Sequence, residues 1–92
     1  MIESFKDEET RKVFLTGKSR RFGSVAQPAL RRLGDMERAT DVMDLRDPPG
    51  NHLERLKGDR AGQWSIRIND QFRICFEWDG KNFQRVEITD YH

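Results

Sequence analysis

The chain has little of what extracellular, metal-binding and membrane proteins depend on. Its only cysteine, Cys75, cannot form an internal disulfide and favours a reducing compartment. The histidines, His52 and His92, are too few for a zinc site. No apolar run is long enough to cross a membrane, and the first residues lack the apolar centre of a signal peptide. These absences predict a cytoplasmic protein with no metal or other cofactor and no membrane partner.

The net charge alone does not identify the chain as a nucleic-acid-binding protein. With 17 Lys and Arg against 16 Asp and Glu, the net charge is +1, so any basic surface must arise from local grouping of arginines. The 92 residues predict one small domain over residues 1–92, in which most apolar side chains are needed for the core. The sequence has no glycine-rich phosphate loop and no serine or cysteine in a recognisable nucleophile motif.

The first half of the chain predicts two helices. Residues 2–5 alternate weakly and suit an edge strand or a lead-in. Asp7 is a suitable N-cap for a first helix, which Gly17 should end. A second helix is expected to begin at Ser24 and to face the sheet with Val25, Ala29, Leu33 and Met36. Thr40 is expected to cap a further turn that carries Val42, Met43 and Leu45.

The Pro48-Pro49-Gly50-Asn51 segment should end all helix, because proline lacks the backbone donor and glycine permits a sharp bend. The residues after it carry strand signals, and we expect no helix among them. Two helices followed by a run of strands predict an α+β fold, with the helices packed on one face of a twisted antiparallel sheet.

Alternation of apolar residues predicts how the first two main strands pair. Their apolar faces stay in phase only if Ile68 opposes Phe72 across a three-residue turn. That register places Arg67 directly across from Arg73. Like charges in this position destabilise a sheet, so the pair needs a reason. Either the arginines point into water or pair with carboxylates such as Glu54 or Asp90, or both bind one phosphate.

The last strand adds groups to the same face. Opposing Phe76 with Val86 would place Glu77 across from Arg85 and Arg73 across from Thr89. Continued alternation would bring Tyr91 to the face of Arg67 and Arg73, flanked by Asp90 and His92. The alternative is a solubilising tail, because the last residues of a domain are usually frayed.

These groups suit acid–base cleavage of a phosphodiester. RNA supplies its own nucleophile, the 2′-OH, and needs a proton acceptor, a proton donor and cations for the transition state. His92 is the natural acid, since its unperturbed pKa lies near neutrality. Asp90 or Tyr91 could accept the 2′-OH proton, or Tyr91 could stack on a base. Lys57, Arg67 and Arg73 would stabilise the phosphate.

Three segments in combination resemble the HigB-type toxins of bacterial toxin–antitoxin systems, which belong to the RelE-like superfamily. They are Leu-Lys-Gly-Asp-Arg-x-Gly-x-Trp-Ser-Ile at 56–66, Asn-Asp-Gln-Phe-Arg-Ile at 69–74 and the closing Asp90-Tyr91-His92. The resemblance extends over essentially the whole chain and implies a microbial-RNase-like α+β fold. It also implies an endoribonuclease, or mRNA interferase, that cleaves messenger RNA in the ribosomal decoding site and inhibits translation.

The resemblance further implies neutralisation by a helix-turn-helix antitoxin of the HigA kind, whose complex with the toxin contacts operator DNA. It assigns the catalytic set to the tail and two basic positions: Asp90, Tyr91, His92, Arg73 and Lys57. Further residues are expected to contact RNA: Arg67, Arg60, Glu54, His52, Arg31 and Arg32. Lys18, Arg20 and Arg21 form a basic loop that is either a solvated connection or part of a surface that docks on ribosomal RNA.

One position departs from the family pattern. Some members have a histidine where this chain has Glu54, and the nearest histidine here is His52. Either Glu54 replaces that group, or His52 reaches in, or cleavage is slow. The alternative function is therefore a weakly catalytic or non-catalytic module of the same fold that binds RNA or protein.

Overall fold

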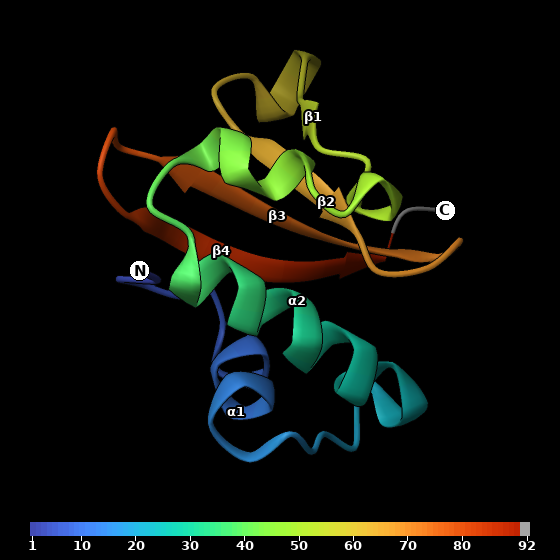
Figure 1. Ribbon diagram of the computed structural model, residues 1–92. Helices are drawn as coiled ribbons and strands as arrows, with labels where there is room; N and C mark the ends of the chain where they lie inside the picture. The colour runs from blue at the N-terminus through green and yellow to red at the C-terminus, as the bar shows by residue number, and fades with distance from the viewer. Residues whose placement is uncertain (91–92) are drawn as a thin grey trace.

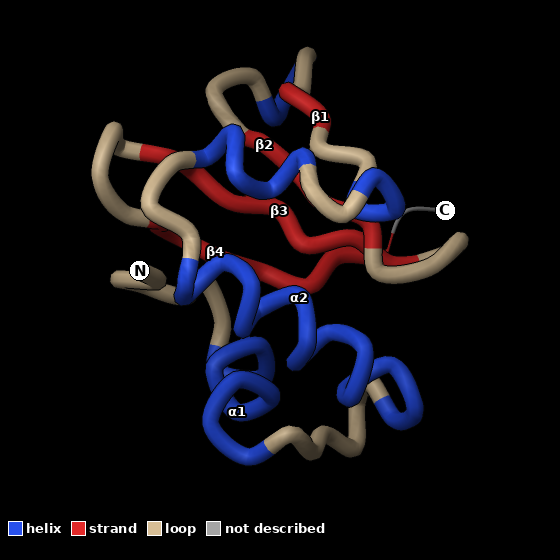
Figure 2. Tube along the Cα trace, viewed as in Figure 1, coloured by secondary structure: helices blue, strands red, loops and turns tan. Residues whose placement is uncertain are grey.

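The computed structural model describes residues 1–90 and has the expected α+β architecture. Two helices, α1 (Glu8–Thr16) and α2 (Ala26–Arg38), lie together along one side of a sheet (Figure 1). The antiparallel sheet has the order β1-β2-β3-β4. Its strands are β1 (Glu54–Arg55), β2 (Trp64–Arg67), β3 (Phe72–Trp78) and β4 (Phe83–Asp90), shown in red in Figure 2.

The N-terminal segment adds an edge to this sheet, as predicted. Ile2 and Phe5 form parallel bridges with Phe83 and Val86 of β4. The Asp7 side chain accepts a hydrogen bond from the Thr10 amide at 2.7 Å, and Gly17 ends α1 with a φ of 71°. Both helix boundaries predicted for α1 are therefore confirmed, because a capping carboxylate and a left-handed glycine stand at its ends.

The second helix was predicted to have Ser24 as its N-cap, and the N-cap lies one residue later, at Val25. Ser24 lies inside a short 3-10 turn, η1 (Gly23–Val25), and α2 begins at Ala26 with no side-chain cap. Val25 at the N-cap position already has helical backbone angles, so the chain enters α2 directly from the turn. Ala26 thereby joins the buried stripe that contains Ala29, Leu33 and Met36.

The turn predicted after α2 exists as η2 (Val42–Arg46), but Thr40 is not its cap. Asp41 accepts a hydrogen bond from the Met43 amide at 2.8 Å, while the Thr40 amide donates to Asp44 at 3.0 Å. A carboxylate at the N-cap position outcompetes the hydroxyl one residue earlier, because Asp41 and Asp44 complete a reciprocal capping box.

The expectation of no helix after the Pro-Pro-Gly segment is also wrong. One 3-10 turn, η3 (Pro49–Asn51), forms within the segment itself, and a second, η4 (Gly58–Arg60), follows it. In η4 the Ala61 amide donates to the Gly58 carbonyl at 3.0 Å, and Gly58 has a φ of 67°. Such turns need only one backbone hydrogen bond, so they leave no periodic apolar pattern in a sequence.

The strand registers were predicted in part. Arg67 opposes Arg73, and Arg73 opposes Thr89, as expected. Beyond Cys75 the predicted pairing of β3 with β4 is wrong, because a register shift sets Glu77 opposite Gln84. Arg85 has a φ of 52° at this irregularity, yet its Nε still lies 3.4 Å from Glu77.

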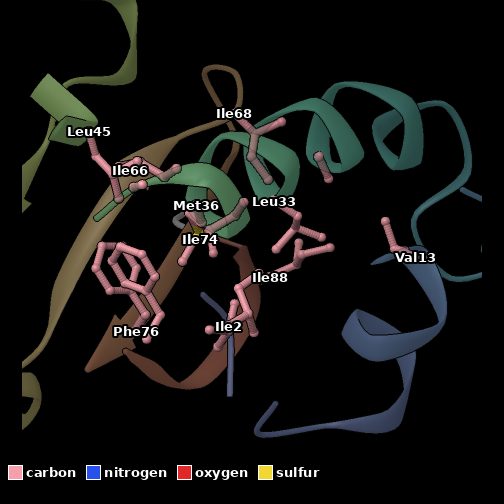
Figure 3. Close-up of a cluster of buried hydrophobic side chains, with 14 of the residues drawn as sticks. Ile2, Val13, Leu33, Met36, Leu45, Ile66, Ile68, Ile74, Phe76 and Ile88 are labelled. Carbon is pink, nitrogen blue, oxygen red and sulfur yellow. The ribbon is translucent and has the colours of Figure 1, made fainter. Parts of the chain in front are cut away.

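The core lies between the sheet and the helical layer. Figure 3 shows Leu33 and Met36 of α2 against Ile66, Ile74 and Ile88 of the sheet, and all these side chains are buried. Successive strand residues point to opposite faces, so burial of these positions sends their neighbours to the other side of the sheet. Within residues 1–90, no helix has the length and apolar character needed to cross a membrane.

Candidate active-site face

The face of the sheet opposite the helices carries a row of polar side chains. Neighbouring strands pair Glu54 with Ser65, Ser65 with Cys75, and Cys75 with Glu87. Directly paired residues share a face, so these positions form one line across all strands of the sheet. We call this surface the open face.

Arg73 is fixed at the centre of the open face. Its Nε donates to the Ser65 hydroxyl at 2.8 Å, and its Nη2 donates to the His52 carbonyl at 2.8 Å. The Glu54 carboxylate lies 3.6 Å from the same Nη2. Only 12% of the Arg73 side chain is exposed, so little conformational freedom remains to be lost when an anion binds.

The opposed arginines do not converge on one point. Arg67 pairs with the Asp70 carboxylate at the β2–β3 turn, whereas Arg73 extends toward Ser65 and Glu54. The predicted alternative in which both guanidinium groups aim at one phosphate is therefore not the arrangement observed. The other alternative, pairing with carboxylates such as Glu54 or Asp90, is found in part, because Glu54 pairs with Arg73 while Asp70, which was not predicted, pairs with Arg67.

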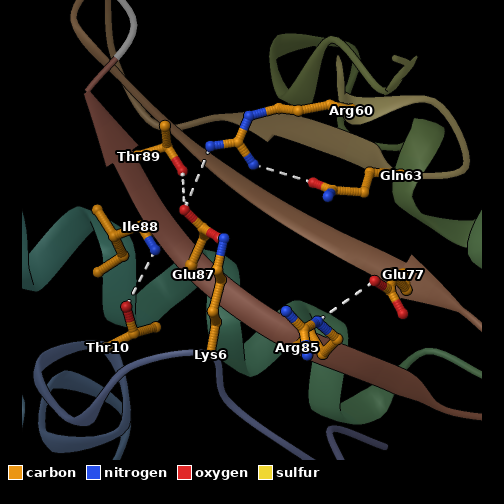
Figure 4. Close-up of polar contacts among 9 residues, drawn as sticks. All are labelled: Lys6, Thr10, Arg60, Gln63, Glu77, Arg85, Glu87, Ile88 and Thr89. Atoms are coloured by element: carbon orange, nitrogen blue, oxygen red, sulfur yellow. Dashed lines mark hydrogen bonds and ion pairs between the residues drawn. The ribbon is translucent and has the colours of Figure 1, made fainter. Parts of the chain in front are cut away.

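The segment from Lys57 to Gly62, here called the basic loop of η4, borders the open face. Lys57 is exposed and precedes η4 as its N-cap residue. Arg60 ends η4 and reaches over the sheet, where its Nη1 donates to Gln63 at 3.0 Å and its Nη2 to Glu87 at 3.4 Å (Figure 4). Lys57 and Arg60, two basic residues expected to contact RNA, thus lie at the two ends of one short turn.

Glu87 is the most enclosed carboxylate in this part of the open face. One of its oxygens lies 3.1 Å from Lys6 Nζ, and the other accepts from Arg60 and from the Thr89 hydroxyl (Figure 4). Burial opposes ionisation, but the hydrogen bond from Lys6 and the charge of Arg60 outweigh it and lower the pKa of Glu87. Glu87 is therefore ionised at neutral pH.

Cys75 lies between Ser65 and Glu87 and is fully buried. Burial raises the pKa of its thiol, because a thiolate would be poorly solvated there. This agrees with the prediction that the chain has no cysteine nucleophile. Within residues 1–90 there is also no group of three or more His, Cys, Asp or Glu side chains able to hold a metal ion.

The tail predicted to be catalytic is described only at its first residue. Asp90 ends β4 opposite Phe72, and its carboxylate accepts a hydrogen bond from the Gln71 amide group at 3.1 Å. Tyr91 and His92 lie outside the described residues, so their place on the open face stays a prediction. Asp90 is exposed and lies opposite Phe72, the first residue of β3 after the β2–β3 turn.

The arginines of α2 lie away from this row. Arg31 is exposed, whereas the Nε of Arg32 donates to the Arg67 carbonyl at 3.2 Å and so joins α2 to the end of β2. His52 contributes its carbonyl to Arg73 through a left-handed backbone with a φ of 45°. Of the residues predicted to contact RNA, the structure brings Glu54 and His52 to Arg73, and Arg60 to Glu87.

Sequence reasoning overlooked two groups at this site. Strand alternation puts Ser65 on the same face as Arg67, but its hydrogen bond to Arg73 is a diagonal contact that alternation alone does not indicate. The position of Glu87 on the open face was easier to predict, because its pairing with Cys75 follows from the same register that places Arg73 opposite Thr89. The alternation of Arg85, Glu87 and Thr89 could therefore have identified it.

Comparisons with known proteins agree with this architecture. Residues 3–92 match the family described as "RelE-like toxin of type II toxin-antitoxin system HigB". The chain is 36% identical over 80 residues to "Toxin HigB-1" of Vibrio cholerae, covering 85% of this chain and 84% of the relative. It is 34% identical over 95 residues to "Endoribonuclease HigB" of Proteus vulgaris, covering 100% of both.

A solved structure shares the fold at much lower sequence identity. A chain of the "YoeB-YefM complex from Staphylococcus aureus" superposes with a TM-score of 0.62 at 15% identity, covering 100% of this chain and 98% of that one. The arrangement of two helices on an antiparallel sheet is therefore a fold already seen in a solved structure. The family match over residues 3–92 and the 36% identity to the Vibrio cholerae relative show that the chain belongs to the HigB family of RelE-like toxins of type II toxin–antitoxin systems.

Proposed function

We propose that this toxin is a ribosome-dependent endoribonuclease that cleaves messenger RNA in the decoding site. The observation that carries the proposal is the guanidinium of Arg73, held on the open face by Ser65 and the His52 carbonyl. A fixed cation at this position suits the charge that develops on a phosphate during cleavage. The name of the Proteus vulgaris relative, an endoribonuclease, supports the same activity.

The chemistry would proceed without a metal. A base removes the proton of the 2′-OH, the 2′-oxygen attacks the adjacent phosphorus, and an acid protonates the departing 5′-oxygen. The products are a 2′,3′-cyclic phosphate and a free 5′-hydroxyl. Arg73 and Lys57 would stabilise the transition state, while Asp90, Tyr91 and His92 would supply the base and the acid.

Dependence on the ribosome has a physical rationale. Few groups on this face can transfer protons, so the enzyme gains if the RNA is already held in a geometry close to that of the attack. The basic residues outside the open face would provide docking contacts with ribosomal RNA. They are Lys18, Arg20, Arg21, Arg31 and Arg32, and the first two border a hollow with Lys12. Charge reversal of Arg31 and Arg32 should weaken ribosome binding.

The partner in the cell would be a helix-turn-helix antitoxin of the HigA kind, and operator DNA would be contacted only through the complex. Membership in a type II toxin–antitoxin family supports an antitoxin partner. Co-expression with the neighbouring reading frame tests this: a stable complex that restores growth is expected, and continued growth arrest would contradict it.

The competing function is a binding module of the same fold with little or no cleavage. Glu54 favours it, because a carboxylate 3.6 Å from Arg73 opposes the approach of a phosphate. The two functions differ in their response to His92→Gln, which should abolish cleavage by an endoribonuclease and leave a binding module unaffected.

The deciding experiment is cleavage of a messenger RNA by purified protein, with and without programmed ribosomes, with the 5′ ends mapped. Cuts within codons that require ribosomes and disappear in His92→Gln support the proposal. Absence of cuts from folded protein that binds ribosomes would overturn it in favour of the binding module. Circular dichroism of both proteins shows whether the substitution has left the fold intact.

A further inference from the structure

Glu87 connects three parts of the chain that otherwise meet only at the sheet. Lys6 comes from the N-terminal edge segment, Arg60 from the basic loop of η4, and Thr89 from β4 itself. Only 13% of the Glu87 side chain is exposed, against 46% for Lys6 and 29% for Arg60. The Glu87 carboxylate is thus the most enclosed group of the cluster, and the more exposed Lys6 and Arg60 side chains lie around it.

The basic loop of η4 needs such a contact. Both Gly58 and Gly62 have left-handed backbones, with φ values of 67° and 92°, and neither has another atom close to where a Cβ would stand. The loop is closed at its base by the Leu56 amide, which donates to the Gln63 carbonyl at 2.9 Å. Glycines at both ends make the loop conformationally permissive, so its position over the sheet depends on side-chain contacts.

Arg60 makes that contact with β4. It lies three residues beyond Lys57, and η4 joins the two through the hydrogen bond from the Ala61 amide to the Gly58 carbonyl. We therefore expect a displacement of Arg60 to shift Lys57, which adjoins this closed turn as its N-cap residue. Lys6 lies 3.1 Å from the other oxygen of Glu87 and so helps to fix the carboxylate to which Arg60 donates.

From this geometry we infer that Glu87 is a positioning residue, which acts through Arg60 to hold Lys57 at the phosphate on the open face. The inference rests on the proposed function for its catalytic consequence, but not for the loop contact itself. Arg60 was expected from the sequence to contact RNA, but in this arrangement its main role is to attach the loop to the sheet. The positive charge that stabilises the phosphate comes from Lys57.

The loop contact is tested by hydrogen exchange of the purified toxin, with no RNA present. In Glu87→Gln, the amides of Ala61 and Gln63 should exchange about tenfold faster than in the parent protein, because opening of η4 becomes easier. Glu77→Gln is the matched control. It removes the charge from another carboxylate on the same face that borders residues 61–63, but Glu77 pairs with Arg85 of the sheet. Equal exchange in Glu87→Gln and the parent would overturn the inference.

The catalytic consequence is tested by a double-mutant cycle. If Glu87 positions Lys57, Lys57→Ala should cost at least about tenfold in cleavage rate in the parent but only about twofold in Glu87→Gln. Glu87→Gln alone should lower kcat and kcat/KM by the same factor, as expected for loss of a transition-state contact. A merely structural role would leave the two effects multiplicative, and this outcome would overturn the inference.

The two tests separate this inference from the proposed function. Faster exchange in Glu87→Gln together with no cleavage by the parent protein would refute the endoribonuclease and keep the loop contact. Cleavage by the parent with multiplicative effects would keep the endoribonuclease and refute the positioning role.

Discussion

The carboxylate of Glu54 lies 3.6 Å from the Nη2 of Arg73, on the face where a phosphate is expected to bind. Glu54 is 56% exposed, whereas Arg73 is 12% exposed. Arg73, which would bind the phosphate, is therefore held in place, whereas Glu54, which would have to move aside, lies at the surface. Binding of a phosphate to Arg73 has to displace or reorient the Glu54 side chain.

We expect Glu54→Gln to strengthen binding of programmed ribosomes. An exposed ion pair contributes up to about 1 kcal/mol, so removal of the competing charge should lower KM by a factor of up to about 5. Steady-state cleavage measures this change. Glu8→Gln, which breaks the exposed pair with Arg11 on α1, is the control and should leave KM unchanged. A higher KM in Glu54→Gln would show that the carboxylate assists binding.

Glu54→His tests a different property of the same position. An imidazole can exchange protons near neutral pH, which an exposed carboxylate does poorly. If proton transfer from this position limits the rate, kcat should rise by at least about tenfold and acquire a pH dependence near 6.5. A kcat equal to that of Glu54→Gln would show that only the lost charge matters here.

Ser65→Ala should impair cleavage by releasing Arg73. The hydroxyl is fully buried and accepts from Arg73 Nε at 2.8 Å, so its loss costs about 1–2 kcal/mol of stability. We expect kcat to fall about tenfold, because a misplaced guanidinium stabilises the transition state less well. Ser19→Ala, which removes a hydroxyl that bonds Glu9 far from β2, is the control. Equal kcat in both variants would show that Ser65 does not position Arg73.

The parts of this fold that could be predicted from the sequence are those set by a local chemical rule. Asp7 and Gly17 bound α1 because a carboxylate caps and a glycine ends a helix. The Arg67–Arg73 register followed from the need to keep two apolar faces in phase. The shift at Arg85 could not be predicted, because a non-glycine residue with a φ of 52° leaves no signal in the pattern.

The candidate site was predicted in its composition more than in its geometry. Pairing of the two arginines with carboxylates such as Glu54 was one of the alternatives, and the structure places Glu54 beside Arg73. The divergence of Arg67 toward Asp70 depends on how two side chains share one turn. The contact of Arg60 with Glu87 depends on a loop that crosses the sheet. Contacts between side chains that are far apart in the sequence do not produce a recognisable sequence pattern.

Thr10→Val should destabilise the fold without touching the open face. The Thr10 hydroxyl is fully buried and accepts from the Ile88 amide at 3.0 Å, which joins α1 to β4 (Figure 4). Valine keeps the shape but leaves that amide without an acceptor, at a cost of about 1–3 kcal/mol. Thr16→Val is the control, since its hydroxyl bonds the Lys12 carbonyl at the exposed end of the same helix. Urea unfolding should therefore separate the two variants, and equal midpoints would contradict this role for Thr10.

The lowered pKa of Glu87 predicts a loss of stability in acid. Lys6 and Arg60 face its carboxylate, the Cys75 thiol stays neutral opposite it, and the folded state therefore binds the Glu87 proton less readily than the unfolded chain. The stabilisation is fully present above about pH 4.3, the ordinary value for glutamate, and is lost as the pH falls through the lower folded-state value. Unfolding free energies of the parent should thus fall more steeply between pH 5 and pH 3 than those of Glu87→Gln. Parallel curves would show that Lys6 and Arg60 do not stabilise the ionised carboxylate.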